Sequence, residues 1–525
     1  MAVAHSWPLA SDPAHLSRLD NDDAALNTWV ITWVAHIVPR QPLQLFNAPT
    51  FHPERNTLAY SEHMFVPAMM GMPLFWAGLS SVLVHNVLLL AGFALSGWAM
   101  FLLMARWSGS AWAGVVAGLI YAFNAHTLTR FPHLQAHHVE FFPLMLYSAD
   151  RLIAERTRTM ALVTAIALVL QALCSNYLLV FTGAALLAIV LVTASEWWPH
   201  RAMRYHWLQI IALAAIALGP FLWPYYQVNR EYGLERSIEE VANYSAGWRD
   251  YLVTGGRLHY DWWSHRLFEG RTALFPGIAA VILAIVGVVT RIRDRRVRMA
   301  IAFGLVGFAL SFGPQLPGYS LIHEYVPLVG GLRNAARWGW LPLASIAVLA
   351  GFGASCLEPS AKGSGASCLV PRASGSVPVL IAIVLVTVEA WRAPVGFTRF
   401  EALPRIYERI AAEENVVLVE FPLYSGERIS ENGPYVLANT RYLRPLVNGY
   451  SGLQPRSFER RAAVLTRFPD PTAVAELRSL GVTHVTVHLD AFRDRHGEPA
   501  VQAIDRVREL QLLGETGGIR LYRLK

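Results

Sequence analysis

The feature that most constrains this chain is a series of apolar segments, several close to the length of a membrane-crossing helix. A helix needs about 20 apolar residues to cross the bilayer core. Only 15% of the residues are charged, whereas a soluble protein carries about 25%. We therefore predict an α-helical polytopic membrane protein. Ten probable spans lie near 83–104, 111–124, 139–153, 160–174, 177–196, 207–226, 273–290, 299–313, 338–356 and 376–392.

The loops between these segments predict the orientation of the chain. Alternate loops are short and rich in arginine, and the richest is 291–298, "RIRDRRVR". Short basic loops face the cytoplasm, so we interpret this run as a topogenic feature that contacts lipid headgroups. The formal net charge of +7 follows from these loops and does not indicate nucleic-acid binding. The regions predicted to lie outside are 1–82, 125–138, 175–177, 227–272, 314–337 and everything after about 393.

Residues 1–82 would lie outside the membrane, although no visible segment carries them across. The stretch "MAVAHSWPLA" lacks the apolar core of a signal peptide. We therefore expect a further helix upstream, an eleventh span of which "AHSWPLA" is the tail. Alternatively, 64–80 could span, but this would place the five-arginine loop outside. We favour 64–80 as a helix lying on the membrane surface.

The sequence predicts three domains. Residues 1–82 form an extracytoplasmic first loop with interfacial helices, and 83–392 form the transmembrane bundle. Residues 393–525 are more polar and form a soluble extracytoplasmic α/β domain. Its predicted strands and helices are strand 415–421, helix 471–481, strand 482–489, helix 498–513 and strand 518–524. The three cysteines have neither zinc-type spacing nor a disulfide pattern.

Acidic residues are concentrated just before an apolar segment, in "LDNDDAALNTW" at 19–29. Ionisable groups beside membrane helices are usually functional. With the three aspartates of this segment, the candidate polar groups of the predicted outer face are Asp20, Asp22, Asp23, Glu62, His63, Arg130, His133, His137, Glu269, Arg271, Arg333 and Arg337. Transfer of a sugar from a lipid-phosphate donor needs such a set. Arginines hold the phosphate as it leaves, and a carboxylate takes the proton of the attacking hydroxyl. A single base would invert the anomeric configuration, as in inverting glycosidases.

The arrangement of a long first outer loop, a helical bundle and a polar C-terminal domain resembles the GT-C superfamily of integral-membrane glycosyltransferases. The segments "DDAALNTWVITWVAH", "NTLAYSEH", "LFPG" and "RPLVNGYSG" further resemble a poorly characterised bacterial branch. The resemblance implies a polyprenyl-phosphate sugar donor, a glycan, lipid or protein acceptor, and a location in the bacterial inner (plasma) membrane. It also implies that Asp23 or Asp22 is the base. The family often has Gly-Asp where this chain has Asp22-Asp23, which leaves the choice between these neighbours open.

Most candidates also have a purely structural interpretation. The three aspartates could form a solvated turn and cap a helix, or Asp20 and Asp22 could bind a divalent cation, although we favour no metal. Arg333 and Arg337, four residues apart and predicted to share a helix face, could clamp a phosphate or extend to lipid headgroups.

Four further sets have structural interpretations. Glu269 and Arg271 could form a surface ion pair. His133, His137 and His138 are best interpreted as interfacial, and Glu62-His63 as a helix cap. We favour "RPLVNGYSG" as a turn between a strand and a helix over a sugar contact.

Two functions other than glycosyl transfer fit parts of this pattern. A transporter or flippase of lipid-linked saccharides would place its ionisable groups at the bilayer midplane and often carries internal repeats, whereas here the groups gather at one face. A structural or assembly protein would need fewer helices as an anchor. We therefore predict a membrane glycosyltransferase.

Overall fold

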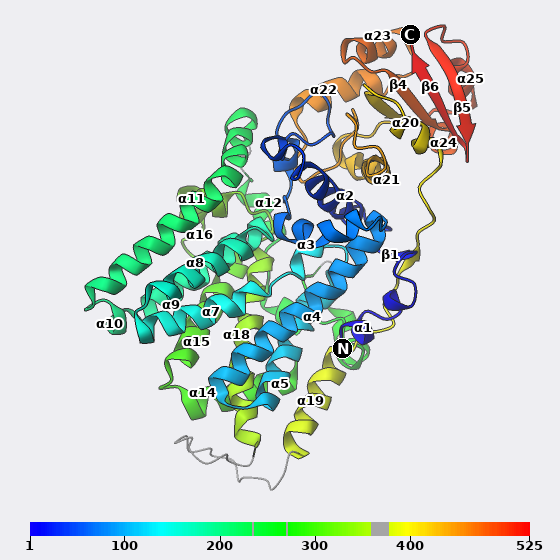
Figure 1. The fold of residues 1–525 in the computed structure, drawn as a ribbon. Helices are drawn as coiled ribbons and strands as arrows, with labels where there is room; N and C mark the ends of the chain where they lie inside the picture. Colours follow the sequence, from blue (N-terminus) through cyan, green and yellow to red (C-terminus); the bar gives the residue numbers. More distant parts are fainter. Residues whose placement is uncertain (234–235, 269–270, 359–376) are drawn as a thin grey trace. The chain divides into compact units, whose positions relative to one another are not determined.

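The computed structural model describes residues 1–233, 236–268, 271–358 and 377–525 (Figure 1). The chain forms two compact units. The first, called here the helical unit, comprises 1–11, 87–221 and 234–396. The second, called the mixed unit, comprises 12–86, 222–233 and 397–525. Two long helices, Ser81–Ser108 (α4) and Arg201–Tyr232 (α11), contribute residues to both units. The three-part division by sequence stays a prediction.

Each of the ten predicted spans coincides with a helix. Besides α4 and α11, these helices are Ala111–Ala122 (α5), Phe141–Glu155 (α7), Arg158–Ala172 (α8), Asn176–Val192 (α9), Ile278–Arg291 (α14), Arg295–Ser311 (α15), Trp340–Ala354 (α18) and Val377–Ala390 (α19). Shorter helices in the helical unit are Ala2–His5 (α1), Ala125–Leu128 (α6), Ala194–Trp197 (α10), Ile238–Asn243 (α12), Arg257–Trp262 (α13), Tyr319–Tyr325 (α16) and Pro327–Gly330 (α17). Two 3-10 helices, Trp248–Leu252 (η5) and Ala335–Gly339 (η8), lie in its loops.

Helix α18 forms the centre of the helical unit. It packs against α5, α14 and α15 (Figure 1), and all of its residues except Ile346 are buried. A Cβ added at Gly287 of α14 would collide with the backbone oxygen of Leu349, and one added at Gly353 would collide with that of Leu283. The two glycines therefore let the backbones of α14 and α18 approach closely, as small residues do in membrane helix pairs.

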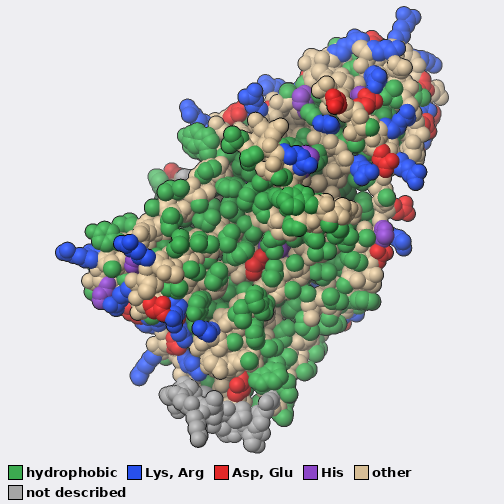
Figure 2. Space-filling view, viewed as in Figure 1, with side chains coloured by type: hydrophobic (Ala, Val, Ile, Leu, Met, Phe, Trp, Pro, Cys, Tyr) green, Lys and Arg blue, Asp and Glu red, His purple; other side chains and the backbone are tan. Residues whose placement is uncertain are grey.

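The outer surface of the helical unit is strongly apolar, and Figure 2 shows hydrophobic side chains covering its helices. In the part of the chain that the structure describes, three helices are long and apolar enough to cross a membrane, namely Ser81–Ser108, Arg201–Tyr232 and Ala335–Leu357. Their neighbours also expose large apolar side chains, among them Ile285 at 57% and Leu305 at 62%. Exposed apolar area on this scale needs an apolar medium, which supports the membrane interpretation. Further exposed apolar residues are Trp98, Leu102, Leu187, Leu191, Leu208, Ile211, Ile216, Ile282, Val384 and Leu385.

The arginines of 291–298 contact carboxylates inside the helical unit. Asp150 of α7 is 1% exposed and accepts hydrogen bonds from Arg295 at 2.6 Å and Arg296 at 2.9 Å. Glu196 of α10 accepts from Arg295 at 2.9 Å and from Arg298 at 2.8 Å. Arg295, Arg296 and Arg298 thus have partners within the protein, and the interpretation of this run as a contact for lipid headgroups stays a prediction. Asp150 lies in the last two turns of α7 and Glu196 in α10, so these helix ends and the 291–298 run gather at one end of the bundle.

The mixed unit combines helices with a small sheet. The sheet has the order β3-β4-β6-β5, in which β3 and β4 are parallel and the other pairs are antiparallel. The strands are Leu418–Phe421 (β3), His484–His488 (β4), Leu510–Thr516 (β5) and Ile519–Leu524 (β6), with a separate pair formed by Leu16–Ser17 (β1) and Thr398–Arg399 (β2). The helices are Asp22–Ile37 (α2), Phe65–Trp76 (α3), Ile406–Ala411 (α20), Gly433–Asn439 (α21), Arg456–Leu465 (α22), Pro471–Ser479 (α23), Leu489–His496 (α24) and Glu498–Ile504 (α25).

The predicted strands at 415–421, 482–489 and 518–524 and the helix at 471–481 are confirmed, with shorter bounds. The helix predicted over 498–513 was wrong beyond Ile504, because Leu510–Thr516 pairs antiparallel with Ile519–Leu524. Gly517 and Gly518 join these strands with φ of 60° and 74°. A two-residue Gly-Gly turn favours a hairpin, and this pairing overrides the helical tendency of the preceding leucines.

Removing the buried carboxylate of Asp150 is expected to destabilise the helical unit. The substitution Asp150→Ala would leave Arg296 without a carboxylate partner among the described residues and Arg295 with Glu196 alone, at a cost of about 3 kcal/mol. The measurement is the free energy of unfolding in a detergent titration of the purified protein. Glu155→Ala, which removes a solvent-exposed ion pair with Arg151 on the same helix, is the control and should cost less than about 0.5 kcal/mol. Equal losses in both variants would contradict this account.

Candidate functional site

The acidic segment at 20–23 begins helix α2 of the mixed unit. The side chain of Asn21 caps this helix by accepting a hydrogen bond from the backbone N–H of Asp23 at 3.0 Å. Asp22 and Asp23 therefore occupy the first turn, where the positive end of the helix dipole favours carboxylates. Both side chains are half-buried, while the rest of α2 is almost entirely buried. The structural interpretation of the aspartates was that one of them caps a helix. Asn21 supplies this cap instead, and neither Asp22 nor Asp23 is the N-cap residue of α2.

Asp23 contacts a segment more than 400 residues away in the sequence. The hydroxyl of Tyr450 donates a hydrogen bond to Asp23 Oδ1 at 2.7 Å. Tyr450 belongs to "RPLVNGYSG", which was predicted to be a turn between a strand and a helix. That prediction was wrong, because this segment connects helices α21 and α22 and runs beside β3, with a bridge between Leu446 and Leu418. The extended path carries Tyr450 to the start of α2.

Asp22 lies against the start of helix α21. A Cβ added at Gly433 would lie 2.8 Å from Asp22 Oδ1, so a side chain there would displace the carboxylate from its present position. Burial raises the pKa of Asp22 above its ordinary value, a hydrogen bond from Ser430 lowers it, and the negative charges of Asp23 and Glu431 raise it. The net direction is upward, so Asp22 is a stronger base than an ordinary aspartate.

Asp20 differs from its two neighbours. Its carboxylate receives two hydrogen bonds from the guanidinium of Arg18, at 3.0 and 3.1 Å. This pairing uses the oxygens that the predicted cation site at Asp20 and Asp22 would need. Among the described residues, no group of three or more His, Cys, Asp or Glu could hold a metal ion. The arrangement therefore supplies no observation in favour of a divalent cation.

The Glu62-His63 pair was interpreted either as a binding group or as a helix cap. The His63 side chain accepts a hydrogen bond at the start of helix α3, as the cap interpretation predicted. The backbone N–H of Phe65, the first residue of α3, donates to His63 Nδ1 at 3.1 Å. Burial lowers the pKa of His63 to about 4, so the ring is neutral at physiological pH. Glu62 is partly exposed beside it. A binding role for either residue stays a prediction.

Within the helical unit, Arg337 is held at the start of α18. Its guanidinium lies 4.4 Å from the ring centroid of Tyr177, and the Tyr177 hydroxyl accepts a hydrogen bond from the backbone N–H of Asn334 at 3.2 Å. Arg337 Nε is buried without a hydrogen-bond partner in the part of the chain that the structure describes. Such a donor is suited to an anion.

The spacing of Arg333 and Arg337 predicted that they share a helix face, but they do not. Arg333 precedes the 3-10 helix η8, whereas Arg337 lies within it. The guanidinium of Arg333 stacks on Tyr244 at 4.9 Å and lies 4.0 Å from Glu240. The prediction failed because the Asn334 side chain caps η8 and redirects the chain between the two arginines.

The 125–138 loop is more buried than expected. Arg130 Nε donates to His126 Nε2 at 3.0 Å. Burial lowers the pKa of His126 well below its ordinary value, and the positive charges of Arg130 and Arg337 lower it further. This electrostatic coupling shows that Arg130 and Arg337 act on the same neutral ring. The two arginines thus concentrate positive charge near one place in the helical unit.

The interpretation of the loop histidines as interfacial was wrong for His137 and His138, which are 1% and 0% exposed. His137 Nε2 lies 3.0 Å from the backbone oxygen of Arg130, and His138 Nδ1 lies 3.0 Å from Glu140 Oε1. Their burial follows from close packing against α4, where a Cβ at Gly92 would lie 2.9 Å from that of His137. His133 is half-buried.

Glu269, the predicted partner of Arg271, lies outside the described residues. Arg271 Nη1 instead donates to Asp250 Oδ2 at 3.4 Å. Asp250 is 4% exposed and also accepts from the backbone N–H groups of Gly247 at 2.9 Å and Thr272 at 2.8 Å. Sequence reasoning missed Asp250, although an acid beside "GWR" in an outer loop was a visible signal.

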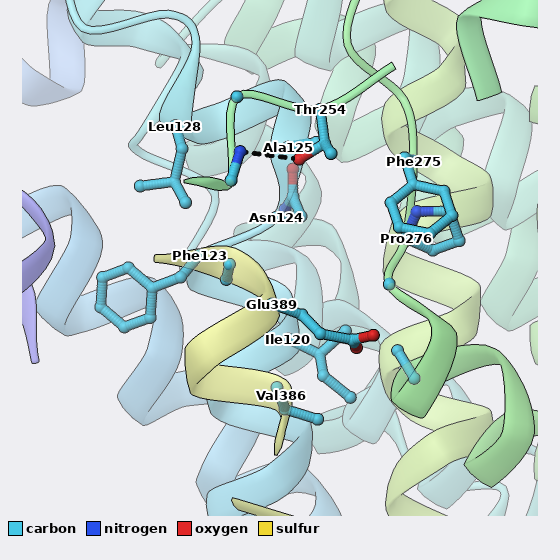
Figure 3. Close-up of a pocket in the computed structure, with 15 residues that line it drawn as sticks. Ile120, Phe123, Asn124, Ala125, Leu128, Thr254, Phe275, Pro276, Val386 and Glu389 are labelled. Carbon is cyan, nitrogen blue, oxygen red and sulfur yellow. Dashed lines mark hydrogen bonds between the residues drawn. The ribbon is translucent and has the colours of Figure 1, made fainter. Parts of the chain in front are cut away.

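Sequence reasoning also missed Glu389, an acid inside the predicted span 376–392. Its carboxylate accepts from the backbone N–H groups of Ile278 at 3.0 Å and Ala279 at 2.9 Å, and lies 3.1 Å from His259 Nε2. Figure 3 shows Glu389 at a cavity of about 20 Å³, a volume that holds about one water molecule. Glu389 therefore caps α14, and this cavity is too small for a sugar.

Comparisons with known proteins give structural likenesses only. No protein-family model matches the chain, and no curated protein matches it. The chain is similar to ArnT from Cupriavidus metallidurans in the apo state, with a TM-score of 0.39 and 12% identity over 96% of this chain and 93% of that one. For ArnT from the same organism bound to undecaprenyl phosphate, the TM-score is 0.40 and the identity 14%, over 95% and 96% of the two chains.

A third similar structure is an oligosaccharyltransferase from Archaeoglobus fulgidus, tethered with an acceptor peptide. Its TM-score is 0.47 at 11% identity, over 93% of this chain and 67% of that one. At TM-scores below 0.5, these likenesses by themselves carry no argument about activity.

The raised pKa of Asp22 predicts a stability effect whose sign depends on pH. The folded state holds this proton more strongly than the unfolded state, so the carboxyl group favours folding at low pH. That contribution is lost as the pH rises through the folded pKa. Asp22→Asn should therefore raise the thermal unfolding midpoint at pH 7.5 relative to wild type and have less effect at pH 3.5.

Asp12→Asn, which alters an exposed acid paired with His15 in the same unit, is the matched control for this measurement. It should leave the midpoint at pH 7.5 unchanged or slightly lower. A lower midpoint for Asp22→Asn at pH 7.5 would contradict the idea that the ionised carboxylate opposes folding.

Proposed function

We propose that this protein is a membrane glycosyltransferase that moves a sugar from a polyprenyl-phosphate donor to a glycan, lipid or protein acceptor on the extracytoplasmic face, with inversion at the anomeric carbon. The sequence resembles the GT-C superfamily in its architecture and in several short segments. The observation that carries the proposal is the hydrogen bond between Tyr450 and Asp23. It joins two segments of that resemblance, "DDAALNTW" and "RPLVNGYSG", which are far apart in the sequence.

The acids at the start of α2 suit the role of a general base. A base works best when its pKa lies near the working pH, and the shift of Asp22 is in that direction. Asp23 is oriented by the Tyr450 hydroxyl, which donates a hydrogen bond to Asp23 Oδ1. In the proposed reaction, one carboxylate takes the proton of the acceptor hydroxyl while the oxygen attacks the anomeric carbon. The bond from that carbon to the phosphate oxygen breaks, and the polyprenyl phosphate leaves.

The arginines of the helical unit suit the binding of a phosphate. No carboxylate among the described residues forms an ion pair with Arg337, and its stacking on Tyr177 fixes the guanidinium plane. Arg130 adds a second positive charge beside the shared neighbour His126. A planar guanidinium donates two parallel hydrogen bonds to phosphate oxygens. We assign Arg337 and Arg130 to the donor phosphate as a proposal separate from that of the base.

Loss of the base is expected to abolish transfer. Membranes containing Asp22→Asn, Asp23→Asn or both would be given radiolabelled polyprenyl-phosphate sugars, with the label measured in a water-soluble or lipid acceptor. The double variant should lose transfer by at least about a hundredfold, the lower range for general-base catalysis. The single variant that loses more identifies the base. Asp12→Asn should transfer at the wild-type rate.

Full transfer by the double variant, in protein that folds and inserts normally, would remove the base assignment. Movement of the lipid-linked sugar across the membrane by wild type, without a new glycosidic product, would instead indicate a transporter.

Loss of Arg337 is expected to weaken donor binding. Arg337→Gln removes a charge-assisted hydrogen bond worth about 1.5 to 3 kcal/mol, so KM for the donor should rise by about tenfold or more. Arg337→Lys keeps the charge but loses the planar guanidinium. Its KM for the donor should lie between those of wild type and Arg337→Gln. Arg201→Gln, an exposed residue at the start of α11, is the control. A normal KM with a lower kcat in Arg337→Gln would contradict a role in ground-state phosphate binding.

A further inference from the structure

The loop at 243–250 of the helical unit forms a polar pocket that the proposed reaction does not yet use. Its volume is about 490 Å³, within the range of about 300 to 1,000 Å³ typical of small-molecule sites. The lining consists of Asn243, Ser245, Gly247, Trp248, Arg249, Asp250, Arg271 and Gln315. Apart from the tryptophan, it contains no large apolar side chain.

The pocket is framed by a fixed backbone. Beside it, the backbone N–H of Ala246 donates to Ser311 O at 2.9 Å, and that of Leu274 donates to Asp250 O at 3.1 Å. The Gln315 amide donates to Ala246 O at 3.3 Å. Beneath these contacts, Ala246 and Leu274 pack with other buried apolar residues. The loop is thus tied to the end of α15 and to the segment before α14, which preorganises the pocket.

The charges of the pocket favour an anion. Arg249 and Arg271 contribute two positive charges, and Asp250 contributes one negative charge. The Asp250 oxygens already accept three hydrogen bonds, from Gly247, Thr272 and Arg271. Arg271 uses one of its five N–H donors in this contact, and its side chain is 35% exposed. Among the described residues, no other group accepts a hydrogen bond from either arginine, so their remaining donors are available to carboxylate or phosphate oxygens.

The remaining lining groups suit a sugar ring. Trp248 is 64% exposed, so a face of its ring is open to a ligand. The negative face of an indole attracts positively polarised groups, and Arg249 already lies 5.3 Å from its centroid. The C–H face of a pyranose carries the same weak positive polarity. Asn243 and Gln315 add amide groups that can pair with hydroxyls.

We propose that this pocket binds a saccharide unit that carries a carboxylate or phosphate group. The choice of a saccharide over a simple anion rests on the proposed function, because a glycosyltransferase must hold sugar groups that neither the base nor the phosphate ligands contact. In this assignment, Trp248 packs against the ring and Arg249 and Arg271 bind the anionic substituent. The pocket thus selects an anionic saccharide over its neutral parent.

The test is direct binding to the purified full-length protein in lipid nanodiscs, measured by titration calorimetry. The probes are glucuronate, galacturonate, glucose 6-phosphate and mannose 6-phosphate, beside glucose, galactose, mannose and inorganic phosphate. At least one anionic saccharide should bind at least tenfold more tightly than both its neutral parent and inorganic phosphate. Equal affinity for inorganic phosphate would reduce the pocket to a simple anion site and overturn the proposal, as would the absence of any selective binding.

Variants assign the binding to the pocket. Trp248→Ala should weaken binding of that saccharide at least tenfold, and Arg271→Gln and Arg249→Gln should each reduce it toward the affinity of the neutral parent. Arg249 has no carboxylate partner among the described residues, so its variant keeps the test valid if Arg271→Gln disturbs Asp250. Trp262→Ala and Arg266→Gln, exposed residues outside the pocket lining, should bind as wild type. Unchanged binding in all three pocket variants would overturn the assignment.

The same measurement separates this inference from the proposed transfer. The Asp22→Asn/Asp23→Asn double variant should bind the saccharide with wild-type affinity, because its substitutions lie in the mixed unit. Selective binding without transfer by wild type would overturn the enzymatic proposal and keep the pocket. Transfer by wild type without selective binding would keep the enzyme and overturn the pocket.

Discussion

The burial of helix α18 is the constraint on which the rest of the helical unit depends. Fourteen of its residues are buried, so every helix packed against it must present small or closely fitting side chains. The glycine contacts with α14 are one result. Another is that the segment leading into α18 has little freedom. The Asn334 side chain caps η8, and Trp338 and Trp340 are buried directly after it. Arg337 lies between these fixed points, so packing of the core orients a side chain at its edge.

In the mixed unit, a buried asparagine determines the position of a side chain at the candidate site. Asn448 is fully buried and forms two hydrogen bonds with the backbone of Glu420 on β3, one in each direction, at 2.7 and 2.9 Å. It thereby fixes an irregular segment beside the sheet much as a further strand would. Tyr450 follows two residues later and reaches Asp23. The geometry at the start of α2 therefore depends on the sheet of the C-terminal region, in agreement with the grouping of residues 12–86 and 397–525 in one unit.

The helices of the bundle could be predicted because each is a long apolar run, and this signal is local. The hairpin of β5 and β6 could have been predicted as well, since "GETGGIRLY" contains a Gly-Gly turn between alternating segments. For the candidate site, the sequence could predict which types of residue take part but not how they contact one another. Sequence spacing placed Arg333 and Arg337 on one helix, whereas Arg337 lies within η8 and Arg333 precedes it. The contact between Tyr450 and Asp23 has no local signal, because it depends on tertiary packing across more than 400 residues.

The hydrogen-bond and ion-pair partners of a charged group distinguish structural from functional candidates in this protein. Asp150 and Asp250 are buried acids and Glu389 is a partly buried one, and the oxygens of all three receive several hydrogen bonds within the fold. Such acids stabilise helix ends and loops, and a ligand would have to displace these partners. Arg337 and Arg249 differ, because each stacks on an aromatic ring and neither has a carboxylate partner among the described residues. Arg337 Nε is also buried without a hydrogen-bond partner among the described residues. Such burial is costly for stability alone, and this cost is understandable if an anion completes the arrangement.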